Sequence, residues 1–417
     1  MTKRKNTSPH VAEQGVLLDS VNAFLQQAKH AQDADSFADL MYGLERLGRT
    51  LYKDKDKEMS AHHFKLAVEN LKKLARTHQN KEQELTLVLS SGQTYLLLGL
   101  WTEARTCFEQ AIRLSSELGD QKKQARIVRQ LANLELKSGR IAEALHLLQQ
   151  SLSLSRDNGE LAEQAAALNS MAACYFQMAE WKKMERVCGQ ALSIAEDLQL
   201  KSLMASINNN LGAMYSLRGK WDEALLAFHK SLSLFELLGD DRGLAETSNN
   251  LATLYRDKEM WPQAGEYYAR SLALAGKIGD ADVKASATLN RVELYVLMHD
   301  LELAEYHCKI ALNAFHELGK ETGVADACRL LGVIHTMREN WRLATRYFKE
   351  ALQLGEKYGS NLVLAETHRD YGDMLRRQQQ KSAAADSLKQ SLKFYQALKA
   401  TKEAQKLKRQ IKALSKA

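Results

Sequence analysis

The chain has 417 residues, of which 45% are hydrophobic and 26% charged, proportions typical of a folded, water-soluble protein. No window approaches the roughly 20 apolar residues of a membrane helix, and no apolar run follows the start MTKRKNTSPH as it would in a secretory signal. The net charge of +7 lies at the two ends: three basic residues among the first five, and six against one glutamate in residues 401–417. The nearly neutral body has no bulk charge to attract phosphate, so we expect no nucleic-acid partner and no membrane insertion.

A forty-residue repeat organises the chain. Its clearest marks are the five tryptophans, which are all separated by multiples of forty residues: Trp101, Trp181, Trp221, Trp261 and Trp341. A column of small residues keeps the same period, at Ala125, Ala165, Ala205, Ala245, Ala285, Ala325 and Ala365. Chance does not hold such columns in phase over seven or more copies, so the sequence predicts a repeat array.

Each copy contains two stripes of helical period. In the copy at 201–240, Leu211 and Tyr215 mark a first helix, while Trp221 and Phe228 mark a second, and residues 218–220 form the turn between them. Glycines fall where each second helix is expected to end, as left-handed caps, at positions 119, 159, 239, 279, 319 and 359. The alanine column is expected where two helices approach too closely for a larger side chain.

The stretch NNLGAMYSLRGKWDEALLAFHKSL (209–232) resembles a tetratricopeptide repeat, with its Leu-Gly-x-x-Tyr, Ala and Phe landmarks. The usual repeat has 34 residues. The forty-residue form, with LGD linkers such as 238–240, is similar to the Leu-Gly-Asn repeat proteins and the kinesin light chains. The resemblance implies an all-α, right-handed superhelical solenoid of antiparallel helix pairs, in which the first helices line a concave groove.

The expected organisation has three parts. Residues 1–35 are predicted to be a basic tail plus a capping helix, and residues 36–400 a solenoid of about nine repeats that begins near LERLGRTLY (43–51). Residues 401–417 are predicted to form a basic capping helix with one apolar face, as the open end of a solenoid requires for solubility.

Three consecutive asparagines stand in the first helix SINNNLGAMY (206–215), although asparagine costs up to about 0.7 kcal/mol against alanine in a helix. By the resemblance, Asn209 faces the groove, together with Asn169 and Asn249 in the neighbouring repeats. An amide offers donors and an acceptor, so this asparagine ladder is predicted to hold the backbone of an extended ligand. Alternatively, the ladder hydrogen-bonds between neighbouring first helices and stiffens the stack; the two roles are compatible. Asn208 and Asn210 are expected to make inter-repeat contacts or to be solvated.

The resemblance places further side chains in the groove. The predicted peptide-binding residues beyond the ladder are Arg129, Asn133, Phe176, Arg256, Arg329, Arg369 and Arg376. This lining suggests a ligand with apolar anchors at one end and acidic residues at the other. A clamp for a C-terminal carboxylate is disfavoured, because Ser170, Ser206 and Asn210 stand where later elements of that motif are needed.

The sequence contains no recognisable catalytic motif. It has no phosphate-binding glycine loop, no HExxH and no CxxC, so we expect no enzyme, no cofactor and no metal. Its five cysteines fall on helices, mostly at core positions, which indicates buried thiols in a reducing, cytoplasmic compartment.

The predicted function is a non-enzymatic protein–protein interaction scaffold or adaptor that binds an extended segment of a protein partner. The alternatives are a peptide-sensing regulator that acts on a separate partner protein, and a self-assembling structural scaffold. The charged last helix argues against end-to-end stacking, so we expect a monomer.

Overall fold

The computed structural model describes residues 42–44, 62, 64–69, 71–73, 80–97, 100–398 and 400–414. The predicted N-terminal tail and capping helix (1–35) therefore lie outside the described residues, as does most of the first predicted repeat. The chain divides into two compact units, residues 1–167 and 168–417, which are described separately below.

The first unit is built from consecutive helix pairs. Its helices are α4 (Lys81–Leu97), α5 (Trp101–Glu117), α6 (Gln121–Lys137) and α7 (Ile141–Asp157). Helix α8 (Leu161–Gln177) begins in this unit and ends in the second.

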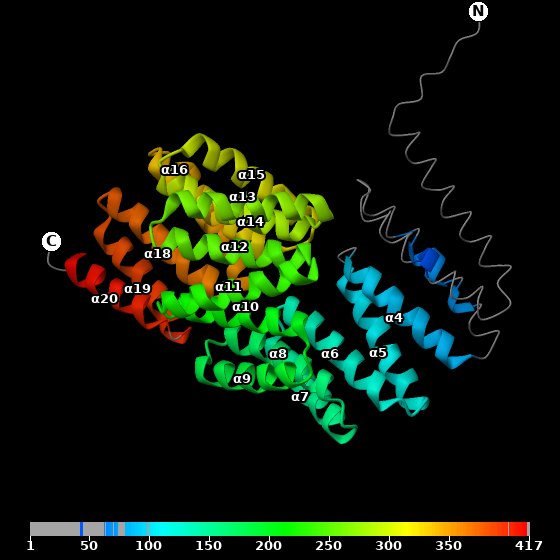
Figure 1. Ribbon diagram of the computed structural model, residues 1–417. Coiled ribbons are helices and arrows are strands. Elements are labelled where there is room, and N and C mark those ends of the chain that lie inside the picture. Colours follow the sequence, from blue (N-terminus) through cyan, green and yellow to red (C-terminus); the bar gives the residue numbers. More distant parts are fainter. Residues whose placement is uncertain are drawn as a thin grey trace, which may run out of the picture. The chain divides into compact units, whose positions relative to one another are not determined.

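The second unit continues the same pattern (Figure 1). Its helices are α9 (Trp181–Asp197), α10 (Lys201–Leu217), α11 (Trp221–Leu238), α12 (Asp241–Asp257), α13 (Trp261–Ile278), α14 (Ala281–Leu297), α15 (Leu301–Glu317), α16 (Glu321–Met337), α17 (Trp341–Lys357), α18 (Asn361–Arg377), α19 (Lys381–Ala397) and α20 (Thr401–Leu414). Even-numbered helices from α4 to α18 are the first helices of their repeats, and odd-numbered ones are the second. The all-α architecture of stacked helix pairs is the one predicted.

The linkers between repeats confirm the predicted glycine caps. All six glycines, at 119, 159, 239, 279, 319 and 359, have φ between 63° and 70°, a left-handed conformation that a residue with a Cβ adopts at a cost. After Gly239, the Asp240 carboxylate accepts hydrogen bonds from the backbone nitrogens of Arg242 (3.1 Å) and Gly243 (3.0 Å). The LGD linker thus ends one helix with its glycine and begins the next with its aspartate.

The alanine column lies where second helices touch first helices. Ser271 of α13 donates a 2.8 Å hydrogen bond to the carbonyl oxygen of Ala245 in α12, and Ser151 makes the same bond to Ala125. A larger side chain than alanine would separate the two backbones and break this bond. The aromatic column packs as closely, because a Cβ added to Gly212 would lie 2.6 Å from the Phe228 ring.

The last helix, α20, packs beside α19 at the C-terminal end (Figure 1). Its buried Ala404 and Leu407 share a hydrophobic cluster with Leu388 and Tyr395 of α19. Lysines and an arginine occupy its outer face. Among the described residues, no helix is both long and apolar enough to cross a membrane.

Candidate functional site

The first helices of the second unit form one layer. Helices α10, α12, α14 and α16 each contact the next even-numbered helix, so the five first helices from α10 to α18 present one continuous face. We call this surface the first-helix layer. It contains most of the predicted binding residues.

The asparagine ladder is a series of side-chain hydrogen bonds between neighbouring repeats. Each bond joins residues forty-one apart, one more than the repeat length. The Nδ2 group of Asn210 donates to Oδ1 of Asn169 (2.9 Å), and that of Asn250 donates to Oδ1 of Asn209 (3.1 Å). One repeat later, Asn290 donates to Oδ1 of Asn249 at 3.2 Å. The ladder therefore has two columns, and each bond joins two neighbouring first helices.

This pairing leaves half of each ladder amide unused. Asn169, Asn209 and Asn249 each employ only the carbonyl oxygen, while their NH₂ groups have no partner among the described residues. All three side chains are half-buried, so the NH₂ groups remain accessible from outside. The inter-repeat bond is present, and it still leaves donors for a ligand.

The three consecutive asparagines of α10 have three different roles. Asn208 is buried and donates to the carbonyl oxygen of Met204 in its own helix (2.8 Å). Asn209 accepts from the following repeat, and Asn210 donates to the preceding one. Inter-repeat contact was one of the two roles expected for Asn208 and Asn210. Asn210 makes such a contact, whereas Asn208 makes a hydrogen bond within its own helix.

Two predicted residues, Arg129 and Asn133, belong to α6 of the first unit. Both nitrogens of the Arg129 fork pair with the buried carboxylate of Glu163, at 2.5 and 3.1 Å. This bidentate pair neutralises the guanidinium group. Arg129 is therefore not a free cation for a ligand carboxylate, which agrees with the absence of the remaining clamp residues.

A charged network occupies the other end of the first-helix layer. At its centre is Arg329 of α16, whose side chain is only 6% exposed. Its guanidinium group contacts four carboxylates on three first helices: Glu293 at 2.7 Å, Asp370 at 3.0 Å, Asp326 at 3.2 Å and Glu366 at 3.4 Å.

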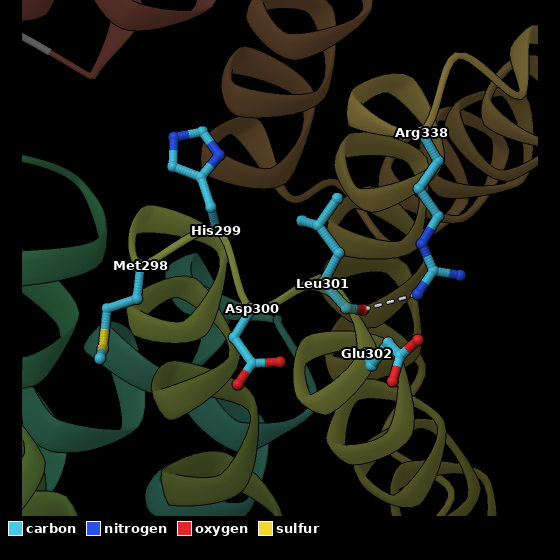
Figure 2. A pocket seen from close by; sticks show the side chains of 6 residues that line it. All are labelled: Met298, His299, Asp300, Leu301, Glu302 and Arg338. Atoms are coloured by element: carbon cyan, nitrogen blue, oxygen red, sulfur yellow. Dashed lines mark hydrogen bonds between the residues drawn. The ribbon is translucent and has the colours of Figure 1, made fainter.

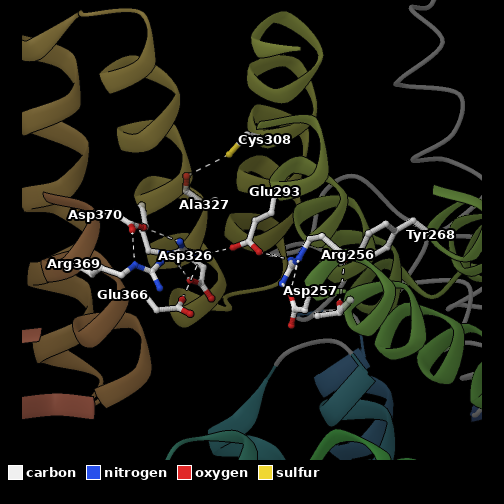
Figure 3. Close-up of polar contacts among 12 residues, drawn as sticks. Arg256, Asp257, Tyr268, Glu293, Cys308, Asp326, Ala327, Glu366, Arg369 and Asp370 are labelled. Atoms are coloured by element: carbon white, nitrogen blue, oxygen red, sulfur yellow. Dashed lines mark hydrogen bonds and ion pairs between the residues drawn. The ribbon is translucent and has the colours of Figure 1, made fainter. Parts of the chain in front are cut away.

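Two more predicted arginines flank this centre. Arg256 pairs with Glu293 and with Asp257, and Figure 3 shows Glu293 lying between Arg256 on one side and the Asp326, Glu366 and Asp370 group on the other. Arg369 pairs with Asp370 at 2.8 Å and donates to the Tyr395 hydroxyl at 3.1 Å.

The charge balance bears on one expectation. Arg329 and Arg369 were expected at the end of the groove that suits acidic ligand residues, but each is already paired, as is Arg256, and the carboxylates outnumber these three arginines. Burial opposes ionisation of Glu293, yet Arg256 and Arg329 outweigh it and lower the pKa of Glu293 to about 2. Burial instead dominates at Glu366, where it raises the pKa to about 7 despite Arg329 and Arg369.

The pKa of Asp326 is shifted in the same direction as that of Glu366. Burial raises its pKa, although Arg329 acts in the opposite direction. The raised pKa values show that the neighbouring arginines do not fully offset the burial of Glu366 and Asp326. An incoming cation suits the surface beside them better than an incoming carboxylate.

The remaining predicted residues lie apart from these groups. Phe176 is half-buried at the end of α8 and contacts the Trp181 ring edge-on, with ring centroids 5.8 Å apart. Arg376 is exposed at the end of α18 and pairs with Asp373 at 3.4 Å. Sequence reasoning omitted Asn250, Asn290 and Asp370 from the site, although a period of forty-one residues already connects Asn169 with Asn210 and Asn250 with Asn209.

The cysteines of the chain are not activated as nucleophiles. All five cysteines are buried free thiols, and burial raises the pKa of Cys174 to about 11 and of Cys188 to about 12, so neither is a thiolate near neutral pH. Within the described part of the chain, no three His, Cys, Asp or Glu side chains are grouped as metal ligands.

Comparison with known proteins identifies the repeat. The family model described as "Tetratricopeptide repeat" matches residues 83–157, 203–277 and 325–397, which together make up more than half of the chain. The chain belongs to the tetratricopeptide repeat family. A comparison with curated proteins gives no match.

Solved tetratricopeptide repeat structures share the fold at low sequence identity. The Rap conjugation gene regulator of plasmid pLS20, in complex with the Phr* peptide, superposes with a TM-score of 0.61 at 15% identity, over 83% of this chain and 95% of that one. Aspartyl phosphate phosphatase F from Bacillus subtilis gives 0.55 at 14% identity (85% and 96%). The apo quorum sensor NprR from B. thuringiensis gives 0.51 at 16% identity (83% and 99%). These likenesses establish the fold.

Proposed function

We propose that this tetratricopeptide repeat protein is a non-enzymatic adaptor that binds an extended segment of a partner protein along the first-helix layer of its second unit. The observation that carries the proposal is the asparagine ladder with its unused NH₂ groups. Successive donors one repeat apart suit the carbonyl groups of an extended backbone, because they recognise the main chain whatever the side chains are.

The helix-propensity cost supports the same assignment. Asparagine at these positions costs up to about 0.7 kcal/mol each relative to alanine, whereas a neutral hydrogen bond contributes about 1 kcal/mol net. The inter-repeat bonds therefore gain little stability over an all-alanine face. A ligand that uses the NH₂ groups supplies the missing reason for retaining the amides.

The charged network sets the chemistry expected of the segment. Because Glu366 and Asp326 lack full compensation by arginine, the segment carries a lysine or arginine that reaches this end of the layer. Such a charge-assisted hydrogen bond contributes about 1.5–3 kcal/mol. We expect Glu366→Gln to weaken binding of the segment by at least about tenfold and to leave the fold intact.

Two triple variants separate ligand binding from stiffening. Asn169/Asn209/Asn249→Ala removes the inter-repeat bonds and the free donors, whereas Asn210/Asn250/Asn290→Ala removes the same three bonds and keeps the donors. Each variant is compared with wild type in a pull-down from native lysate with identification by mass spectrometry. The affinity for the captured segment is then measured by calorimetry.

The proposal expects partners to be lost from the first variant and retained by the second. Equal retention by both variants would show that the ladder is structural. Equal loss from both, with unchanged circular dichroism, would assign the effect to the inter-repeat bonds rather than to the donors.

A second candidate is a regulator that senses a free peptide. Two structures of similar fold are described as a peptide-bound gene regulator and a quorum sensor, which motivates the test. Small-angle scattering before and after addition of the identified segment decides between the two. A change in the radius of gyration favours the sensor, and an unchanged profile favours the adaptor.

A further inference from the structure

Helix α15 has a row of exposed apolar side chains that are not needed for the packing of its repeat. Leu303, Tyr306 and Ile310 follow a spacing of three and then four residues, and they are 42%, 62% and 42% exposed. They span about 10 Å along the helix. We call them the apolar row; the corresponding residues of α13 are all polar or charged: Gln263, Glu266 and Arg270. A contiguous exposed group of this kind indicates contact with another molecule.

The central side chain of the apolar row is held in place. The Tyr306 ring meets the His307 ring edge-on, with centroids 5.2 Å apart, and His307 stacks on Tyr295 of α14 at 5.5 Å. An aromatic group positioned by its neighbours loses little conformational entropy on binding. Tyr306 is therefore suited to act as an anchor.

A row of cationic side chains lies on α17, which is the second helix of the next repeat and, like α15, one of the outer helices. Arg342, Arg346 and Lys349 of α17 follow a spacing of four and then three residues, and they line a hollow along this helix together with one carboxylate, Glu350. None of the three forms an ion pair with a described residue, in contrast to the buried Arg329. We call them the basic row, and its charge is available to a partner.

The apolar and basic rows belong to neighbouring parts of one surface. Tyr347 of α17 packs against the hydrophobic cluster that contains Ala304 and Cys308 of α15, so the two outer helices share a core. Tyr306 and Arg346 occupy the same position in successive repeats. The central residues of the two rows therefore lie at equivalent places on the second helices of successive repeats.

A hollow of mixed apolar and polar lining lies at the turn before α15. Figure 2 shows the hollow at this turn, with Met298 and Leu301 among its lining residues and Arg338 reaching the Leu301 carbonyl oxygen at 3.1 Å. Met298 is exposed. Arg338 also pairs with Glu305 at 2.5 Å, which ties the end of α16 to α15.

We propose that this outer surface of α15 and α17 docks an acidic amphipathic helix of a partner protein. The apolar stripe of that helix covers the apolar row, and its acidic flank pairs with the basic row. Both rows have the spacing with which helices present side chains to each other. The site is separate from the first-helix layer, so an adaptor can hold two proteins at once.

Other anionic partners fit this surface less well. A nucleic acid would neutralise the basic row and would leave the apolar row uncovered. An anionic bilayer has no fixed spacing of acidic groups to match the basic row, whereas a helix presents its side chains at that spacing. A helix of mixed character covers both rows together.

The test uses two synthetic, alanine-rich peptides of about 18 residues, long enough for helix formation. Both have leucines at helical spacing; one carries glutamates on one flank and the other carries lysines at those positions. Fluorescence anisotropy with the full-length protein is expected to show at least about tenfold tighter binding of the glutamate peptide. Equal affinities, or tighter binding of the lysine peptide, would overturn the proposal.

Matched variants locate the site. Tyr306→Ser is expected to weaken the glutamate peptide by about tenfold, whereas Leu226→Ser, at the same position of α11 and 59% exposed, leaves it unchanged. Arg342→Glu/Arg346→Glu removes the preference for glutamate over lysine. Lys182→Glu/Arg186→Glu, at the matching positions of α9, does not.

Two outcomes would refute the assignment. Loss of binding in the α9 and α11 variants to the same extent would show nonspecific attraction. A single-stranded oligonucleotide or phosphatidylserine vesicles bound more tightly than the glutamate peptide, with the same dependence on the basic row, would identify a different class of partner.

Discussion

The two ends of the first-helix layer use the same repeat positions in opposite ways. The column that contains Asn169, Asn209 and Asn249 continues forty residues at a time through Leu289 to Arg329 and Arg369. The amides keep unused donors, whereas the arginines are fully engaged with carboxylates. At this one repeat position, therefore, the side chain keeps an unused donor in some repeats and joins a charged network in others.

The difference has an energetic reason. A neutral amide loses little when half of its hydrogen-bonding capacity faces solvent. A buried guanidinium group or carboxylate left without a partner costs several kcal/mol, so charged groups at this position must find partners within the chain. Consequently, the asparagine end is suited to recognising a main chain, and the charged end to recognising a compensating charge.

The largest expected effect comes from the centre of the network. Arg329→Met leaves Glu293, Asp326, Glu366 and Asp370 without their shared cation. We expect a loss of about 3–5 kcal/mol of stability, because breaking a buried ion pair leaves uncompensated charge. Urea denaturation followed by circular dichroism measures the loss. Arg376→Ala, which removes an exposed pair, should change stability by less than about 0.5 kcal/mol; similar losses in both variants would contradict the comparison.

The second effect is a pH dependence with a defined sign. The folded-state pKa of Glu366, about 7, lies above its unfolded value of about 4.3, so the folded chain binds the extra proton between these values. Stability therefore falls as pH rises through this window, and Glu366→Gln flattens the fall.

Thermal melts at about pH 5 and about pH 8 measure this effect in wild type and in the glutamine variant. Glu293, whose pKa is lowered to about 2, acts in another window: it contributes stability that is lost only as pH falls below about 4. A melting midpoint that falls by the same amount in wild type and in the glutamine variant between about pH 5 and about pH 8 would rule out the assignment to Glu366.

The smallest effect is expected at the asparagine end. Asn210/Asn250/Asn290→Ala removes three inter-repeat hydrogen bonds of about 1 kcal/mol each and recovers up to about 0.7 kcal/mol of helix propensity at each position. The net loss should be about 1 kcal/mol, which the same urea titration detects. A loss comparable to that of Arg329→Met would show that the ladder serves mainly to stiffen the stack.

Part of the candidate site was predictable from the sequence. The forty-residue period places Asn169, Asn209 and Asn249 at one repeat position, and family resemblance assigns that position to the groove. Pairing was not predictable, because it depends on the offset between neighbouring helices. That offset joins Asn169 to Asn210 rather than to Asn209, and it gathers Asp326, Glu366 and Asp370 around Arg329.

The sequence by itself determined the repeat architecture. Apolar and small residues recur at positions where two helices must be buried against each other, and glycine recurs where the backbone must take positive φ; both are local requirements that letters display. Tertiary structure alone decided which polar groups remain free. Whether an arginine is a ligand-binding cation or a neutralised member of a network depends on carboxylates one repeat away, at distances that the spacing of residues along a helix does not specify.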